Sequence, residues 1–343
     1  MTAVTIRSFR AKSYGCLRDV EVPLGTRLHA FVGPNDSGKS TLLRGIRTVL
    51  EGARAETSRA SHGGPEDRST LVQCEVEGGS YTIEIDEDTP SQHLIRRDDL
   101  AMSWIRAGGP DKPEAQPILD QLRGARLCQF DASALRSPSG LVPRSDVVGF
   151  FDERGLGLPG IYQAILGRGD ETFAQIRESV HRLFPTVKRI AIVPVTRSEV
   201  SLEIELTDGT RVRASEMSAG LLYYLAFAAI PHLDPVSALL LEEPENGLHP
   251  ARIAEVLRLL RDFAERTDTQ VFLATHSPLV LNELSADEIS VVTRPSLETG
   301  TVVTPLRKTP HFETRSKVYA LGELWLAYCD GELEAPLLDE RIK

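Results

Sequence analysis

The N-terminal part of the chain alternates between apolar and polar positions over short distances. Residues 5–25 predict two short strands around a turn, with Ile6, Phe9, Val20 and Val22 as the inward-facing side chains. These four residues are the candidates for the side chains that face inward from a small sheet.

A change from strand to helix follows at a glycine-rich turn. Residues 27–33 predict a third strand that leads directly into this turn. Between Ser40 and Gly52 the apolar residues recur at helical spacing, and the glycine predicts the helix end. The apolar face of this helix consists of Leu42, Leu43, Ile46, Val49 and Leu50.

The middle of the chain is less regular. Residues 53–67 are polar and predict a loop, and residues 71–86 predict a hairpin around a Gly-Gly turn. Residues from about 88 to 117 are polar and contain several prolines and glycines, which predicts a surface loop or insertion. Helical patterns dominate residues 117–194, and residues 200–214 predict a second hairpin with an Asp-Gly turn.

A strand–helix–strand alternation occupies the C-terminal third. Residues 237–243 and 270–277 predict buried strands, and residues 251–266 between them predict a helix. This is the pattern of a βαβ unit with parallel strands. Residues 322–333 predict one more helix.

Composition and charge exclude some classes of function. The formal net charge is -10, so a basic field over the whole surface is excluded, and contact with DNA would need a local patch. No apolar run approaches the ~20 residues of a membrane helix, and the N-terminus lacks the pattern of a signal peptide. The 4 cysteines have no CxxC spacing, which argues against a zinc site. We therefore expect a cytoplasmic protein without a membrane segment.

The glycine-rich turn has the spacing of a phosphate-binding loop. It reads Gly33-Pro34-Asn35-Asp36-Ser37-Gly38-Lys39-Ser40-Thr41, which satisfies GxxxxGK[ST] between a strand and a helix. Such a loop surrounds phosphate oxygens with backbone N–H groups, assisted by the helix N-terminus. Lys39 is then expected to reach the β- and γ-phosphates, and the Ser40 hydroxyl to ligate Mg²⁺.

Two carboxylates and a histidine follow buried strands. Glu242 and Glu243 end the strand at residues 237–243, and His276 ends the next one. Beside a phosphate loop, the first acid is expected to hold Mg²⁺ and the second to accept the proton of the attacking water. The histidine is placed to contact a γ-phosphate. Taken singly, each of these residues is more often structural.

Ser218 and Gly220 stand at the start of an apolar helical run. A Ser-x-Gly helix start offers a hydroxyl, backbone amides and the helix dipole to an anion. The serine is also an ordinary helix cap. The pair therefore indicates an anion-binding turn only because it lies upstream of the strand that ends in two carboxylates.

The ordered set of these segments resembles the ABC-type ATPases, and within them the overcoming-lysogenization-defect (OLD) and RecF-like class, often labelled AAA-15 or AAA-21 domains. The resemblance rests on GPNDSGKST, SAGLL, LLLEEPENGLHP and FLATHSPLVL, and extends to the opening strands. It implies an α/β P-loop NTPase fold: an ABC-type head with a mixed central sheet, an antiparallel β-subdomain and a helical insertion. It also implies ATP and Mg²⁺ as ligands and a homodimer or higher oligomer whose heads close around ATP.

The resemblance assigns roles to individual positions. Glu242 would be the Walker B acid, Glu243 the general base and His276 the switch histidine. Ser218 and Gly220 would be signature residues presented to the ATP of the opposite subunit. The Walker A residues would be Gly33, Asn35, Gly38, Lys39, Ser40 and Thr41, and the D-loop Asn246, Gly247, Leu248 and His249.

The resemblance also makes Gln129 a candidate Q-loop ligand of Mg²⁺. Two features depart from the family pattern. The signature lacks the LSGGQ form of transporters and reads Met217-Ser218-Ala219-Gly220-Leu221-Leu222 instead. Glu242 replaces the commoner aspartate.

The domain expectation is one ATPase head over residues 1–343. Within it we expect a β/P-loop lobe at 1–90, a loop and helical insertion at about 88–195, and a lobe at 196–343 with the signature, Walker B acid and switch histidine. Sustained heptads between the phosphate loop and the signature are absent, which argues against the coiled-coil arms of SMC proteins. We expect the residues after His276 to be too few for a Toprim nuclease domain. We interpret their acidic tail as solvated surface.

The function expected from these features is ATP binding and hydrolysis that drives or gates a separately encoded effector, in anti-phage defence or DNA metabolism. One alternative is a regulatory scaffold that binds ATP and turns over slowly. Another is a RecF-like DNA-binding ATPase. Its candidate phosphate contacts are Arg54, Arg59, Arg68, Arg96, Arg97, Lys188 and Arg189.

Overall fold

Three β-sheets organise the computed structural model, which describes residues 6–52, 69–86, 92–98, 103–106, 116–143 and 146–329. Contacts divide the chain into two compact units. Unit 1 comprises the residues up to Leu127, Val236–Glu243 and the chain from Ala264 onward. Unit 2 comprises Cys128–Pro235 and Pro244–Phe263. Two short segments of the C-terminal third therefore belong to different units.

Unit 1 contains an antiparallel sheet of order β2-β1-β4-β5-β6-β7. Its strands are β1 Ser8–Tyr14, β2 Leu17–Pro23, β4 Ser69–Val76, β5 Gly79–Asp86, β6 Gln92–Arg97 and β7 Ser103–Arg106. The predicted inward residues Ile6, Phe9, Val20 and Val22 are all buried, which confirms that prediction, although Ile6 precedes β1.

The second sheet of unit 1 is mixed, with the order β16-β15-β3-β14-β13-β8. Its strands are β3 Leu28–Val32, β8 Ala125–Cys128, β13 Ala238–Glu242, β14 Gln270–Thr275, β15 Ile289–Ser296 and β16 Gly300–Pro305. Strands β13, β14, β3 and β15 are parallel, and β16 is antiparallel to β15. The predicted βαβ unit is confirmed, and its strands become direct neighbours.

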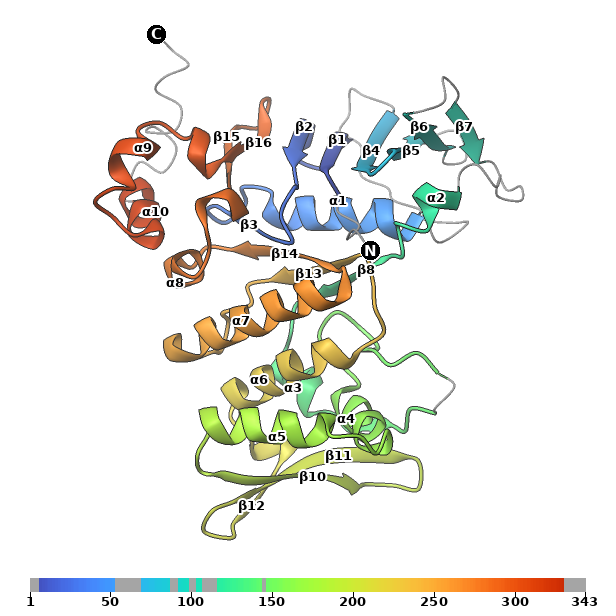
Figure 1. Ribbon diagram of the computed structural model, residues 1–343, viewed down its shortest axis with the longest axis vertical. Coiled ribbons are helices and arrows are strands. Elements are labelled where there is room, and N and C mark those ends of the chain that lie inside the picture. Colours follow the sequence, from blue (N-terminus) through green and yellow to red (C-terminus); the bar gives the residue numbers. More distant parts are fainter. Residues whose placement is uncertain are drawn as a thin grey trace. The chain divides into compact units, whose positions relative to one another are not determined.

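Helix α1 (Lys39–Gly52) lies between the two sheets of unit 1 (Figure 1). Its apolar residues are buried in one core with side chains from both sheets, among them Phe9 and Phe272. The helix is therefore fixed on two faces, and so is its N-terminus, where the phosphate loop ends.

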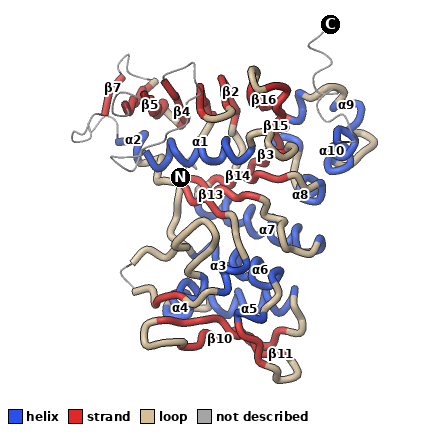
Figure 2. The backbone as a smooth tube through the Cα atoms, turned by 180° about the vertical axis from the view of Figure 1, so that it is seen from behind, coloured by secondary structure: helices blue, strands red, loops and turns tan. Residues whose placement is uncertain are grey.

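Unit 2 contains the sheet β10-β11-β12, with β9 paired to β11. Its strands are β9 Ser139–Gly140, β10 Val187–Pro194, β11 Glu199–Leu206 and β12 Arg211–Arg213. Helices α4 and α5 pack on this sheet (Figures 1 and 2). The helices that follow α1 are α2 Gln116–Leu119, α3 Ala132–Arg136, α4 Leu158–Gly167, α5 Thr172–Leu183, α6 Ala219–Ala229, α7 Pro250–Thr267, α8 Pro278–Asn282, α9 Phe312–Arg315 and α10 Leu321–Cys329.

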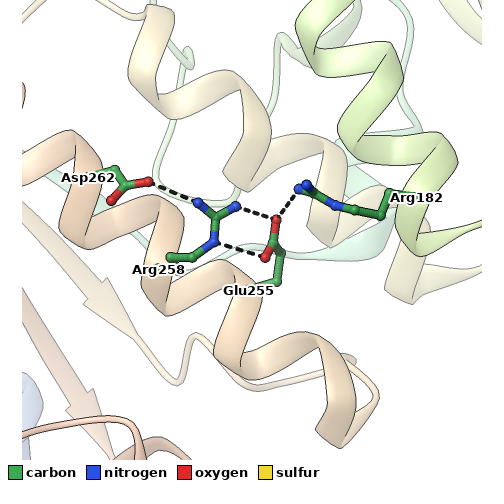
Figure 3. A network of polar contacts seen from close by, with 4 residues as sticks. All are labelled: Arg182, Glu255, Arg258 and Asp262. Carbon is green, nitrogen blue, oxygen red and sulfur yellow. Dashed lines mark hydrogen bonds and ion pairs between the residues drawn. The ribbon is translucent and has the colours of Figure 1, made fainter.

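A charged network joins α5 to α7 within unit 2 (Figure 3). The Arg182 and Arg258 guanidinium groups both donate to the Glu255 carboxylate at 2.6 Å, and Arg258 also donates to Asp262 at 3.1 Å. The hydrogen bond from Arg258 lowers the pKa of Glu255. The carboxylate stays ionised and links the two helices.

The α/β class with a mixed sheet and a separate antiparallel sheet agrees with the sequence expectation, but strands β6, β7, β8 and β10 were not expected. The predicted loop at 88–117 is wrong over β6 and β7, which extend the antiparallel sheet. Strands β8 and β10 lie where helical patterns were expected. Residues 53–67 lie outside the described residues, as does the acidic tail with Asp330, Glu332, Glu334, Asp339 and Glu340.

Among the described residues, no helix has both the length and the apolar character needed to cross a bilayer.

Candidate functional site

The phosphate loop lies at the carboxyl end of β3, in the middle of the parallel strands of unit 1. All five residues of β3 are buried, with β14 on one side and β15 on the other. Helix α1 begins at Lys39. The loop is therefore the strand-to-helix connection that a phosphate-binding loop requires, with the helix N-terminus directed at the ligand position.

Two glycines of the loop are required by close contacts. A Cβ on Gly33 would lie 2.2 Å from the Val292 carbonyl oxygen. Gly38 has φ +108°, and a Cβ there would lie 2.2 Å from Thr301 Oγ1. Any larger residue would displace the loop from the strands that hold it.

Lys39 is buried and stabilises the curve of the loop. Its Nζ donates hydrogen bonds to the carbonyl oxygens of Gly33 and Pro34, both at 2.8 Å. The ammonium group thus lies within the arc of the loop, where the phosphates of a nucleotide would be surrounded by backbone amides.

Ser40 and Glu242 meet although they are far apart in sequence. The Ser40 hydroxyl donates to Glu242 Oε2 at 3.0 Å. Glu242 ends β13 and is 9% exposed, and its other oxygen, Oε1, has no hydrogen-bond partner among the described residues. A buried carboxylate with one unsatisfied oxygen, beside a hydroxyl, is a donor set that Mg²⁺ prefers. The residues present therefore fit this ion.

Glu243 adopts a strained backbone conformation. Its φ is +46°, in the left-handed region that non-glycine residues rarely adopt, and its N–H donates to the Ala274 carbonyl at 2.8 Å. Its Oε2 lies 2.8 Å from His276 Nδ1, at an ion-pair distance but without hydrogen-bond alignment. The carboxylate and imidazole thus form a close pair at the ends of adjacent strands.

His276 is held by its backbone while its side chain is 55% exposed. The indole N–H of Trp325 on α10 donates to the His276 carbonyl at 3.1 Å. The next residue, Ser277, donates its N–H to Thr275 Oγ1 at 2.9 Å. The histidine therefore projects from a fixed turn and its ring remains accessible to a ligand.

One cleft of about 530 Å³ connects the phosphate loop with the two acids, and His276 lies beside it through its contact with Glu243. It is lined by Cys16, Asn35, Asp36, Ser37, Gly38, Lys39, Ser40, Thr41, Glu242, Glu243, Ala274 and Arg294. Both acids therefore line the same cleft as the phosphate loop. Sequence reasoning missed Cys16, Arg294 and Trp325, because no motif marks them and only the folded sheet brings them to the loop.

The predicted signature and D-loop lie together in unit 2. Ser218 caps α6 by accepting a hydrogen bond from the Leu221 N–H at 3.3 Å. A Cβ on Gly220 would lie 3.0 Å from the Gly247 carbonyl oxygen. Gly247 has φ +73° and lies against the Tyr223 ring. The two glycines allow the signature turn and the D-loop to approach closely.

Gln129 also belongs to unit 2, where it follows β8 and is exposed. Its N–H donates to the Glu153 carbonyl at 2.7 Å. Its role as a magnesium ligand stays a prediction.

The basic residues proposed as DNA contacts are spread over the chain. Arg96 and Arg97 end β6, and Lys188 lies on β10, where its Nζ is 2.8 Å from Glu205. Arg54, Arg59 and Arg68 lie outside the described residues. A basic patch for DNA stays a prediction.

Two protein families match parts of the chain. Residues 143–282 match a family described as "AAA domain, putative AbiEii toxin, Type IV TA system", and residues 4–107 match one described as "AAA domain". The first match includes the signature turn, both acids and His276, and the second includes the phosphate loop.

Curated relatives share low but extended similarity. The chain is 23% identical to the OLD nuclease of Thermus scotoductus over 80% of its length, and 23% identical to protein ea59 of Escherichia phage lambda over 85%. These matches cover 59% and 56% of the two relatives, so the chain spans less than two thirds of their length. An energy-coupling factor transporter ATP-binding protein of Methanospirillum hungatei is 27% identical over 44% of the chain and 68% of its own length.

Solved structures of SMC heads share the fold. An SMC head bound to the C-winged-helix domain of ScpA matches 88% of this chain and 98% of its own, with a TM-score of 0.61 and 17% identity. An SMC head domain with an extended coiled coil, bound to the C-terminal domain of ScpA derived from Pyrococcus furiosus, matches 92% and 99%, with a TM-score of 0.56 and 16% identity. The P-loop NTPase fold expected from sequence is confirmed.

Proposed function

Because the chain belongs to the OLD and RecF-like class of P-loop ATPases, we propose that it binds and hydrolyses ATP in the cleft around Lys39. The observation that carries this proposal is the 3.0 Å hydrogen bond between Ser40 and Glu242. It joins the end of the phosphate loop to a buried strand-end acid more than two hundred positions away. In a nucleotide site these two residues would together ligate Mg²⁺.

The predicted site residues have distinct tasks in this reaction. Lys39 exchanges its carbonyl partners for oxygens of the β- and γ-phosphates and neutralises their charge. Ser40 and Glu242 would hold Mg²⁺, which when bound supplies charge neutralisation of the phosphates. Glu243 accepts a proton from water as the water oxygen bonds to the γ-phosphorus and the bond to the ADP oxygen breaks. His276, beside Glu243, contacts the γ-phosphate and responds to its loss.

A second copy of the chain completes the site in this proposal. Ser218 caps an 11-residue helix, so its hydroxyl and the following amides form an anion-binding turn in unit 2. We place this turn against the ATP of the opposite protomer, as the family resemblance implies. Closing and opening of the homodimer in the cytoplasm would then gate a separately encoded effector, in anti-phage defence or DNA metabolism.

The decisive experiment compares Glu243→Gln with the parent. The variant keeps the shape of the side chain but cannot accept the proton, so its steady-state turnover should fall on the order of 100-fold. Its affinity for MgATP should stay within about threefold, and sizing with MgATP should show a stable dimer.

Lys39→Ala is the matched variant, because it should lose nucleotide binding itself. Turnover of Glu243→Gln at the parental rate would remove Glu243 from its assigned role. Parent protein that binds MgATP but releases no phosphate would favour the slow regulatory scaffold. Stimulation of turnover by duplex DNA, with affinity that falls steeply as salt rises, would favour the DNA-binding alternative.

A further inference from the structure

The hairpin β15–β16 braces the phosphate loop from the side opposite β14 and β13. The Val292 carbonyl lies against Gly33, where a Cβ would be 2.2 Å from its oxygen. On the second strand, the buried Thr301 hydroxyl donates to the Ser37 carbonyl at 2.8 Å. The hairpin thus contacts the loop at both of its strands.

A second hollow of about 280 Å³ lies between this hairpin and the loop. It is lined by Pro34, Asn35, Asp36, Ser37, Arg294, Ser296 and Leu297. Arg294, Asn35, Asp36 and Ser37 also line the cleft that contains Glu242 and Glu243. The two hollows therefore meet along the loop, with a guanidinium side chain on their shared wall.

The order of the strands indicates which end of the cleft would hold the phosphates of a nucleotide and which end its nucleoside. Glu242 stands on β13, which is separated from β3 by β14, while β15 flanks β3 on its other side. Ser40 and Glu242 mark the end of the cleft where the terminal phosphates belong. The ribose and base are at the opposite end of a nucleoside triphosphate, and the hollow lined by the hairpin lies on that side.

Leu297 gives this hollow an apolar surface. It stands at the tip of the hairpin and is 73% exposed, and the hollow also contains the polar loop residues Asn35, Asp36 and Ser37. An exposed leucine beside a phosphate site can pack on the face of a planar base and be removed from water by it.

We propose that the hairpin β15–β16 forms the nucleoside end of the site, an inference that rests on the proposed function. Arg294 binds the phosphate nearest the ribose, and Leu297 packs on the base of a nucleoside triphosphate seated beside Asn35. Thr301 acts as a positioning residue, because it holds the Ser37 carbonyl and leaves the ligand to the other two side chains.

The test measures binding of MgATP and of magnesium tripolyphosphate, which lacks ribose and base, to the full chain. Leu297→Ser should weaken MgATP on the order of fivefold and leave tripolyphosphate unchanged, because only ATP has a base to contact. Arg294→Gln should weaken both ligands about tenfold, since both carry the phosphate in question.

Two control variants match these changes. Val318→Ser alters an apolar residue that is 74% exposed outside both hollows, and Arg18→Gln alters an exposed arginine whose side chain packs by Gly300 of the same hairpin. Neither should change the affinity for either ligand.

The outcomes separate this inference from the proposed function. Parental protein that binds neither MgATP nor tripolyphosphate would refute the ATP site itself. Normal binding by the parent, with Leu297→Ser equal to the parent for both ligands, would overturn the nucleoside end alone. Arg18→Gln could instead weaken MgATP but not tripolyphosphate, while Leu297→Ser weakens neither ligand. This result would place the base on the β1–β2 side and would also overturn the proposal for the hairpin.

Discussion

Individual residues of the cleft are held in conformations that few other residues could adopt. Gly33 and Gly38 lie within van der Waals contact of β15 and β16, and Glu243 keeps a left-handed backbone conformation at the end of β13. Glycine adopts such positions without strain, whereas the left-handed conformation of Glu243 costs of order 1–3 kcal/mol and persists only where the surroundings enforce it. This strain at a residue that lines the cleft supports a functional role for the cleft.

Gly38→Ala should damage both stability and nucleotide binding. The added Cβ would meet Thr301 Oγ1 at 2.2 Å with φ at +108°, so we expect a loss of about 1–3 kcal/mol in the free energy of unfolding. MgATP affinity should fall at least tenfold, because the loop amides move. Gly25→Ala is the control, since a Cβ there meets nothing within 4 Å, and urea denaturation with nucleotide titration measures both effects. Equal stability of the two variants would contradict the expectation.

His29 should make the fold sensitive to acid. Burial lowers the pKa of His29 to about 4, although Glu288 opposes this shift, and the ring contacts Thr26 and Ser290. Below pH 6.5 the unfolded chain binds a proton that the folded chain does not, so stability falls as the pH drops from about 6.5 to about 4. Above pH 6.5 both states are neutral and the contribution vanishes.

The measurement compares urea denaturation of the parent and His29→Gln across this range. The parent should lose up to about 3 kcal/mol more than the variant between pH 6.5 and 4. His311→Asn, at an exposed histidine whose left-handed backbone asparagine tolerates, should follow the parent. Parallel curves for the parent and His29→Gln would contradict the role of His29.

At the scale of elements, the strong periodic signals predicted the fold well and the weak ones did not. The helix that starts beside Lys39 and the strands that end at Glu242 and Thr275 were expected from long apolar patterns. Strand β6 was not predicted because it has one fully buried apolar residue, Ile95. Ile95 is covered through cross-strand pairing with Tyr81 of β5, which local sequence does not reveal. Such pairing depends on tertiary neighbours, and local propensity does not encode it.

The same distinction applies to the site. The residues with motif spacing, such as Lys39 and Glu243, were predicted from sequence and line one cleft. Trp325, Arg294 and Thr301 were not, because each reaches the site from a separate element through a sheet or helix contact. Sequence spacing identifies the chemistry of a loop, whereas the supporting contacts depend on the folded arrangement.

Helix α10 should support the turn that carries His276. Trp325→Phe keeps the aromatic packing but removes the N–H that donates to the His276 carbonyl, a hydrogen bond that contributes about 1 kcal/mol. Turnover should fall about threefold to tenfold while MgATP affinity stays unchanged, because the histidine acts after binding. Leu326→Ala, at an exposed position of the same helix, is the control and should keep parental turnover. A change of affinity without a change of turnover in Trp325→Phe would contradict this assignment.

At the scale of the whole molecule, the proposed dimer can be tested by mixing two inactive variants. Lys39→Ala lacks a nucleotide site but keeps its signature turn, and Ser218→Arg has the reverse defect. In a 1:1 mixture half of the dimers should be mixed, each with one complete site, so activity should recover to about one quarter of the parental value. Phosphate release measured before and after mixing tests this, and a mixture as inactive as its parts would contradict a site shared between protomers.

The place of β3 in the mixed sheet also has a consequence for synthesis on the ribosome. The strand ends at Val32, but its two neighbours begin only at Gln270 and Ile289. At roughly 5–20 residues per second, the nascent chain carries this strand for tens of seconds before either edge can pair. The unpaired backbone N–H and C=O groups of an exposed, mostly apolar strand can pair with strands of other chains. We therefore expect truncated translation products that stop before β14 to aggregate more readily than the complete chain.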